Sequence, residues 1–157
     1  MPRVKREANV TWEGNVARGT GAISAASGSF DNLAYSLATR IGNPEGMTSP
    51  EELVAAAHAA CFAMSLAGEL AGAGPSPQHL DVRAVVTLDE VEDGSHRIVA
   101  SELHARARVR ARVKETDTEK LERLAAAASE GCPLTKLIEA SAKVTVTATL
   151  EGESDGD

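Results

Sequence analysis

Apolar and polar residues alternate along several stretches of the chain, which is the pattern of strands with one buried face. Ala8, Val10 and Trp12 alternate with polar neighbours and predict a first strand. In the stretch 104–113, small apolar residues alternate strictly with one histidine and four arginines, so we expect a helix to pack closely against the apolar side. Strands are also predicted over residues 16–24, 33–40, 82–88 and 144–150.

A long apolar helix is predicted from Ser49 to about Ala71, and its start has complete capping chemistry. Ser49 can cap the helix, Pro50 suits its first position, and Glu52 closes a capping box. Apolar residues cover nearly every side of this helix, so we expect it to be buried.

Two shorter helices are predicted closer to the C-terminal end. The first opens at a capping box over residues 116–119 and is capped by Gly131. The second begins at Cys132 and Pro133 and runs to about Ala140. Helical spacing puts four apolar residues of the first helix on one face: Leu121, Leu124, Ala125 and Ala128.

The order of the predicted elements is three strands, a helix, two strands, two helices and a strand. This order indicates an α+β fold with mainly antiparallel sheets around one buried central helix. A chain of 157 residues is about one domain, which we place at residues 1–150. Residues 151–157 form an acidic tail that we expect to be disordered.

The charge balance argues against a nucleic-acid partner. The chain has 16 basic and 23 acidic residues, a net charge of −7, whereas nucleic-acid binders neutralise phosphates with an excess of cations. We therefore interpret the arginines of residues 104–112 as a solvated sheet face, paired with acidic residues such as Asp81 and Asp89 on the neighbouring strand.

The sequence favours a cytoplasmic protein without a membrane span. The stretch 53–74 is long and apolar, but His58 and Glu69 interrupt it and Ala and Gly dominate it. Residues 1–6 lack the apolar core of an export signal. In the cytoplasm we expect both cysteines to be free thiols.

The cysteines are the residues with the strongest chemical signal. Two cysteines and four histidines without paired-ligand spacing argue against a metal site, and no phosphate loop or other cofactor motif is present. Cys61 lies in the middle of the apolar helix, where a cysteine is often an inert small side chain. Cys132 starts a helix, whose positive end stabilises a thiolate. From the residues alone, a redox pair and two structural cysteines both remain open.

Each cysteine lies in a longer motif. The run from Ser49 to Phe62, SPEELVAAAHAACF, resembles the N-P-E-E-L-x-x-A-A-H-A-A-C-F signature of the OsmC/Ohr hydroperoxide reductases. The run GCPLTK, residues 131–136, resembles their second-cysteine motif G-C-P-x-S-K, with Thr135 in place of serine. Residues 11–14 and 38–40 match the OsmC branch better than the Ohr branch.

The resemblance implies a cysteine-based thiol peroxidase that reduces organic hydroperoxides and hydrogen peroxide and acts as an intertwined homodimer. By position, Cys61 corresponds to the peroxidatic cysteine and Cys132 to the resolving cysteine. Arg40 corresponds to the arginine that holds the thiolate, and Glu51 to the acid that orients this arginine. The family also points to a lipoyl-type dithiol as reductant, with no cofactor and no metal.

Helix geometry constrains how these four residues can meet. Glu51 and Cys61 are ten residues apart on one predicted helix, which is about 15 Å along its axis. Either Arg40 spans much of this gap, or Glu51 of one subunit serves Cys61 of the other. The second arrangement would explain an obligate dimer.

Two other functions are compatible with the sequence. One is a non-catalytic binding domain on the same fold, with both cysteines structural. The other is a cysteine-dependent hydrolase that uses His58 as its base, because His58 and Cys61 are neighbours at helical spacing. We favour packing of His58 at the seam of the dimer over a role as a base.

Overall fold

The computed structural model describes residues 3–74, 77–109 and 117–151. The chain divides into two compact units, residues 1–53 and residues 54–157. The predicted single domain over residues 1–150 stays a prediction.

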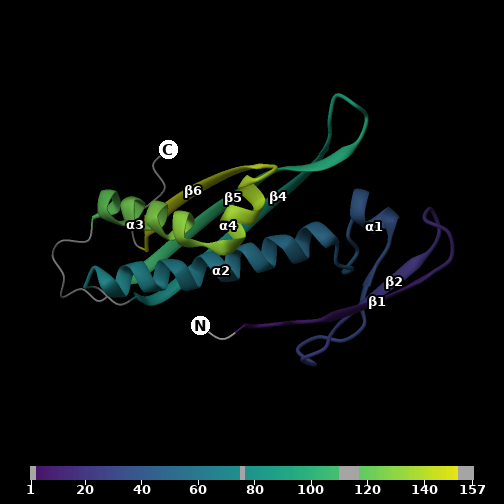
Figure 1. Ribbon diagram of the computed structural model, residues 1–157, viewed down its shortest axis with the longest axis horizontal. Helices are drawn as coiled ribbons and strands as arrows, with labels where there is room; N and C mark the ends of the chain where they lie inside the picture. Colours follow the sequence, from purple (N-terminus) through teal and green to yellow (C-terminus); the bar gives the residue numbers. More distant parts are fainter. Residues whose placement is uncertain (1–2, 75–76, 110–116, 152–157) are drawn as a thin grey trace. The chain divides into compact units, whose positions relative to one another are not determined.

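The first unit is a small antiparallel sheet followed by a short helix (Figure 1). Its strands are β1 (Ala8–Glu13), β2 (Thr20–Ala25) and β3 (Leu33–Tyr35), in the order β1-β2-β3. The Trp12 and Tyr35 rings pack at a centroid distance of 5.5 Å. Gly21 lies under the Tyr35 ring, and any side chain there would collide with that ring.

The predicted strand over residues 33–40 is wrong beyond Tyr35. The chain turns instead into helix α1 (Leu37–Ile41), which carries Arg40. The cause is a capping box, in which Ser36 Oγ accepts from the Thr39 amide and Thr39 Oγ1 accepts from the Ser36 amide, at 3.1 and 3.2 Å.

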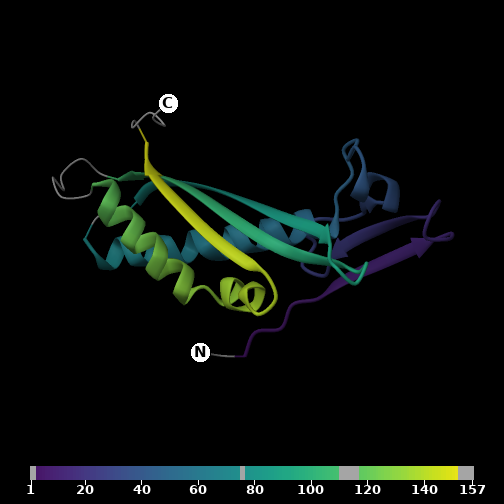
Figure 2. The ribbon, with the colours of Figure 1, turned by 90° about the horizontal axis from the view of Figure 1, so that it is seen from above.

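The second unit contains a three-stranded sheet and its covering helices. The strands are β4 (Pro77–Glu90), β5 (His96–Val109) and β6 (Lys143–Leu150), in the order β4-β5-β6. The pair β4–β5 is antiparallel, but β5 and β6 run parallel, as Figure 2 shows. A parallel neighbour needs a crossover, which α3 (Thr118–Gly131) and α4 (Pro133–Glu139) supply. The α+β class is confirmed.

The core of the second unit lies between this sheet and helices α2 (Pro50–Gly72) and α3. The expected small inner face of β5 is confirmed, because Ala105 and Ala107 are buried beside the buried face of α3.

On the outer face of this sheet, Arg106 stands opposite Asp81 as expected, and Arg108 forms an ion pair with Glu151. Asp89 lies opposite Arg97, which is outside the predicted arginine stretch of residues 104–112. Residues 110–113 of the predicted strand and residues 152–157 of the predicted tail lie outside the described residues.

Helix α2 is buried along one side only, so the expectation of burial on nearly every side is wrong for a single chain. The buried side chains are one helical stripe: His58, Phe62, Leu66 and Leu70. Met64, on another side, is 74% exposed. A single sheet can cover only one side of a helix, which is the reason for the difference. Among the helices described, α2 is also the one long and apolar enough to cross a membrane by length and composition.

Candidate active site

The fold brings the two cysteines together although 71 residues separate them. The Sγ atoms of Cys61 and Cys132 lie 3.1 Å apart, and both residues are free thiols. Cys61 projects from the middle of α2 and is partly exposed, whereas Cys132 is fully buried between α3 and α4. At this distance, two thiols can share a proton and can form a disulfide after a small movement.

The two thiols differ in how easily they carry a negative charge. Burial and the neighbouring Cys132 raise the pKa of Cys61 above its ordinary value. Burial also opposes ionisation of Cys132, but hydrogen bonding from Cys61 and Thr135 outweighs it, so the pKa of Cys132 is lowered. Within the second unit, the negative charge therefore rests more easily on Cys132 than on Cys61.

The cation expected from the sequence, Arg40, is held in the first unit by Glu51. The Arg40 guanidinium meets both Glu51 carboxylate oxygens, with Nη2–Oε1 at 2.5 Å and Nε–Oε2 at 3.1 Å. Such a two-point ion pair fixes the plane of the guanidinium. The bond to Arg40 lowers the pKa of Glu51, and the bond to Glu51 raises the pKa of Arg40. The family resemblance implied this pairing.

The start of α2 explains why Glu51 is available to Arg40. Ser49 Oγ accepts from the Glu52 amide at 3.1 Å, as the predicted cap requires. The Glu52 carboxylate accepts from the Thr48 hydroxyl at 2.8 Å. Ser49 and Glu52 make these contacts at the first turn of the helix, and the Glu51 carboxylate pairs with the Arg40 guanidinium.

His58 is buried inside its own chain, so the expected packing at a dimer seam is wrong. Its ring nitrogens lie 2.8 Å from Ser101 Oγ and 2.9 Å from Thr135 Oγ1. Because both nitrogens are engaged, His58 is not placed to act as the base of a Cys61 hydrolase. Burial lowers the pKa of His58, and Glu139 opposes this shift, so the ring is neutral at pH 7.

Sequence reasoning missed the partnership of Ser101 and Thr135 with His58. A signal for Ser101 existed, because this serine falls on the inner face of β5, in phase with Leu103 and Ala105. A buried hydroxyl in an apolar row needs a buried polar partner. The candidate partner, His58, lies 43 residues away in the chain, so the pairing itself could not be read from spacing.

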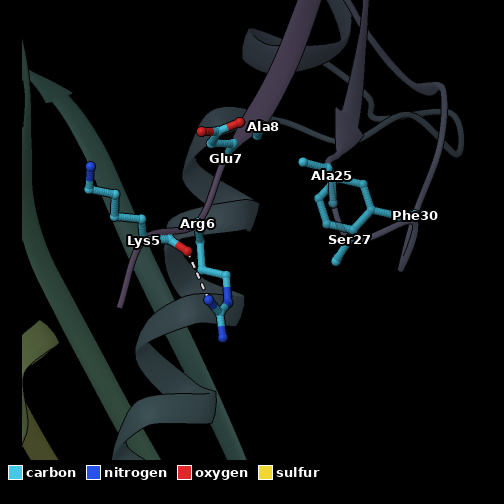
Figure 3. Close-up of a pocket in the computed structure, with 8 residues that line it drawn as sticks. Lys5, Arg6, Glu7, Ala8, Ala25, Ser27 and Phe30 are labelled. Carbon is cyan, nitrogen blue, oxygen red and sulfur yellow. Dashed lines mark hydrogen bonds between the residues drawn. The ribbon is translucent and has the colours of Figure 1, made fainter. Parts of the chain in front are cut away.

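The first unit has a small apolar pocket beside Arg40. Its volume is about 190 Å³, and it is lined by Trp12, Val16, Tyr35, Ser36, Leu37 and Arg40. A larger, open hollow lies in the same unit between the chain before β1 and the end of β2 (Figure 3). Lys5, Arg6 and Phe30 line this hollow, and its lining includes no cysteine or histidine.

Metal-ligating residues do not cluster in the part of the chain that the structure describes. Over residues 3–74, 77–109 and 117–151, no group of three His, Cys, Asp or Glu side chains is placed to hold a metal ion.

Three comparisons with known proteins agree on the family. The family model for OsmC-like proteins matches residues 42–147. The chain is 34% identical over 137 residues to the peroxiredoxin OsmC of Escherichia coli (strain K12), covering 87% of this chain and 92% of that protein.

Solved structures give the same result at the level of the fold. The organic hydroperoxide resistance protein OhrB of Bacillus subtilis is 27% identical, with a TM-score of 0.70 over 91% of this chain and 98% of that one. An organic hydroperoxide resistance protein from Elizabethkingia anophelis has a TM-score of 0.74 at 21% identity, over 96% of this chain and 100% of that one. With its two cysteine motifs, its fold and these similarities, the chain belongs to the OsmC-like protein family.

Proposed function

We propose that this chain, a peroxidase of the peroxiredoxin type, reduces organic hydroperoxides and hydrogen peroxide through Cys61 and Cys132. The observation that carries the proposal is the 3.1 Å separation of the two free thiols. The names of two similar proteins, a peroxiredoxin and an organic hydroperoxide resistance protein, support the choice of peroxide as substrate.

The first step is attack of the Cys61 thiolate on the peroxide. Its sulfur forms a bond to one peroxide oxygen while the O–O bond breaks, which gives a sulfenic acid and an alkoxide that takes a proton to become an alcohol. With hydrogen peroxide, the leaving group becomes water. Cys61 suits this step because its sulfur is partly exposed, whereas Cys132 is fully buried.

Arg40 is the proposed source of the positive charge that Cys61 needs. The pKa of Cys61 is raised by burial and by Cys132, so its own unit does not favour a thiolate there. A guanidinium stays charged at all working pH values and can also donate to the leaving oxygen. Glu51 acts on the reaction through Arg40, by fixing the plane of the guanidinium.

Cys132 completes the catalytic cycle. Its sulfur attacks the sulfenic acid, an S–S bond forms, the S–O bond breaks, and the hydroxyl leaves as water. An external dithiol then reduces this disulfide by thiol–disulfide exchange and is itself oxidised. We propose a lipoyl-type dithiol as the reductant, on the strength of the family resemblance.

The pocket beside Arg40 supports a preference for organic hydroperoxides. Its lining is mostly aromatic and aliphatic, from Trp12, Val16, Tyr35 and Leu37. An alkyl chain in this pocket would leave water, which favours binding by roughly 25 cal/mol per Å² of apolar surface. Hydrogen peroxide offers no such surface.

A cytoplasmic homodimer is the proposed form of the enzyme. Met64 on the largely apolar helix α2 is 74% exposed, and Val10 on β1, where apolar and polar residues alternate, is 56% exposed. A second copy of the chain would cover such surfaces in a two-fold dimer. In that dimer, the Arg40–Glu51 pair of one subunit would serve Cys61 of the other, which is one of the two arrangements that helix geometry allows.

The test is the intact mass of the reduced protein after one equivalent of cumene hydroperoxide. The proposal predicts a loss of two hydrogens in the wild-type chain, because one disulfide forms. An unchanged mass would contradict it and would instead favour a binding domain with structural cysteines. The Cys132→Ser variant is the control, and it should gain one oxygen instead.

A further inference from the structure

A buried row of polar side chains leads from the sheet to Cys132. Ser101 on β5, His58 on α2 and Thr135 on α4 are each fully buried, and they are joined by contacts of 2.8 and 2.9 Å. Buried polar groups cost free energy unless they are hydrogen-bonded, so these three residues need one another. The peroxidase cycle described above makes no use of His58 or Ser101.

The hydrogen bonds on Thr135 limit where its proton can point. A hydroxyl has two acceptor positions and one proton. Thr135 Oγ1 has two neighbours that can donate to it, the His58 Nε2–H group at 2.9 Å and the Ser129 hydroxyl at 3.5 Å. If both donate, the Thr135 proton is left for a third partner.

Ser101 determines which way the hydrogen bonds of this row are donated. A neutral histidine ring has one donor nitrogen and one acceptor nitrogen. When the Ser101 hydroxyl donates to His58 Nδ1, the ring proton lies on Nε2 and is directed at Thr135. The charged group that acts on the ring is Glu139 of α4, and burial outweighs it in keeping the ring neutral.

The position of Cys132 at the start of α4 makes its sulfur the candidate for this third partner. Cys132 is the N-cap of α4 and Thr135 is three residues further on, the same spacing as Ser36 and Thr39 at the start of α1. In α1, the two side-chain oxygens at this spacing lie 2.9 Å apart. In α4 the Cys132 sulfur makes no capping bond like that of Ser36. The Thr135 side chain nevertheless contributes to lowering the pKa of Cys132, which favours its thiolate.

We infer that His58 is a positioning residue that directs the Thr135 hydroxyl proton onto the Cys132 sulfur and so prepares the second thiol for attack. The row then runs Ser101 O–H to His58 Nδ1, His58 Nε2–H to Thr135 Oγ1, and Thr135 O–H to Cys132 Sγ. The role of this row of hydrogen bonds in the reaction rests on the proposed function.

The row assists the second chemical step. Once Cys61 has become a sulfenic acid, Cys132 must lose its proton and attack, with its sulfur bonding to Cys61 as the hydroxyl leaves and takes a proton to form water. A hydrogen bond from Thr135 stabilises the Cys132 thiolate that carries out this attack.

The test is the pKa of Cys132, measured by absorbance near 240 nm in a Cys61→Ser background, where Cys132 is the remaining cysteine of the chain. Thr135→Val, which removes the hydroxyl at nearly constant shape, should raise this pKa by about one unit, and Thr135→Ser should leave it near its starting value. His58→Gln, which keeps an N–H group for Thr135, should raise it less than His58→Leu. Ser101→Ala should act in the same direction as His58→Leu but more weakly.

The chain offers a matched control for these variants. His104 Nδ1 and Thr147 Oγ1 lie 2.9 Å apart, but Thr147 is exposed on the outer face of the sheet. Thr147→Val removes the same hydroxyl from the same kind of pair and should leave the pKa of Cys132 unchanged. Melting temperatures of all variants separate a loss of stability from a shift of the thiol pKa.

A second measurement places the effect in the reaction. In the chain with both cysteines, Thr135→Val should slow disulfide formation about tenfold without slowing sulfenic acid formation. Equal pKa values of Cys132 in Thr135→Val and Thr135→Ser would overturn the inference. The titration needs no peroxide, so a wild-type chain that fails to consume peroxide would contradict the proposed function and not this inference.

Discussion

The two compact units each hold half of the proposed chemistry, and the halves differ in kind. The first unit holds an ion pair between Arg40, in the last turn of α1, and Glu51, in the first turn of α2. The second holds two sulfur atoms 3.1 Å apart in a largely apolar core, next to a neutral histidine. The first unit therefore holds the Arg40–Glu51 ion pair, and the second holds both candidate nucleophiles.

The difference suggests how one protein activates two thiols in turn. A permanent cation beside both sulfur atoms would favour both thiolates at once, and two like charges at this distance repel strongly. In the proposed account, Arg40 favours the charge on Cys61 for the first step, and neutral hydroxyl donors favour it on Cys132 for the second. Changes in either unit should then affect different steps.

The largest expected effect is that of Cys61→Ser. A serine hydroxyl is not ionised at neutral pH, so peroxide consumption should fall by at least about a thousandfold. The fold should persist, because the swap is nearly isosteric and Cys61 is partly exposed. Consumption measured by ferrous–xylenol orange at a rate within tenfold of the wild type would contradict the assignment of Cys61.

Cys132→Ser should remove turnover but not the first reaction. Without the second thiol, the sulfenic acid at Cys61 persists and is oxidised further by excess peroxide. Intact mass should show one added oxygen at one equivalent of peroxide and two at excess. A mass without added oxygen would mean that Cys61 is not the residue that attacks.

Met64→Glu should separate the subunits if the exposed side of α2 is the dimer interface. Met64 is 74% exposed in one chain, so a charge there leaves the single chain intact but is costly in an apolar interface. Light scattering should report a dimer for the wild type and a monomer for the variant. The matched change Phe62→Ala, on the buried side, should cost about 3–5 kcal/mol of stability instead. A Met64→Glu dimer would reject this interface.

Glu51→Gln should have the smallest effect, because Glu51 acts through Arg40. The rate of peroxide consumption should fall by roughly three- to tenfold, and the double variant with Arg40→Ala should be no slower than Arg40→Ala alone. The partly exposed ion pair should contribute no more than about 1 kcal/mol.

The pH dependence of stability has a definite sign at Glu51. Its pKa is lowered in the folded chain, so its stabilising contribution is present above the unfolded value of about 4.3 and is lost as pH falls through the lower, folded pKa. Melting temperatures of wild type and Glu51→Gln should therefore differ at pH 7 and converge once the pH has fallen below the folded pKa of Glu51. Parallel curves over that range would leave Glu51 without a stabilising bond to Arg40.

The sequence predicts the long, regularly patterned elements well. The alternation around Ala105 and Ala107 and the helical spacing from Leu121 to Ala128 both describe side chains that the structure buries. The strand predicted through Arg40 was wrong because the capping pair of Ser36 and Thr39 outweighs a weak alternation over few residues. Alternation alone also could not show that β6 runs parallel to β5.

The residues of the candidate site could be predicted from the sequence better than the contacts between them. The motif residues Cys61, Cys132, Arg40 and Glu51 could be named from the resemblance, and the structure pairs them two by two. His58 was misplaced because one histidine among alanines gives no sign of its partners. These partners come from two distant elements, so packing alone decides them.

The most direct test of the central claim, that Arg40 supplies the charge for Cys61, is a thiolate titration in the Cys132→Ser background, followed by absorbance near 240 nm. The account predicts a pKa of Cys61 below the ordinary thiol value of about 8.5 with Arg40 present, and above that value in Arg40→Ala. Arg40→Lys should restore little of the shift, because a flexible ammonium lacks the planar fork that Glu51 holds. The same pKa of Cys61 with and without Arg40 would contradict the account.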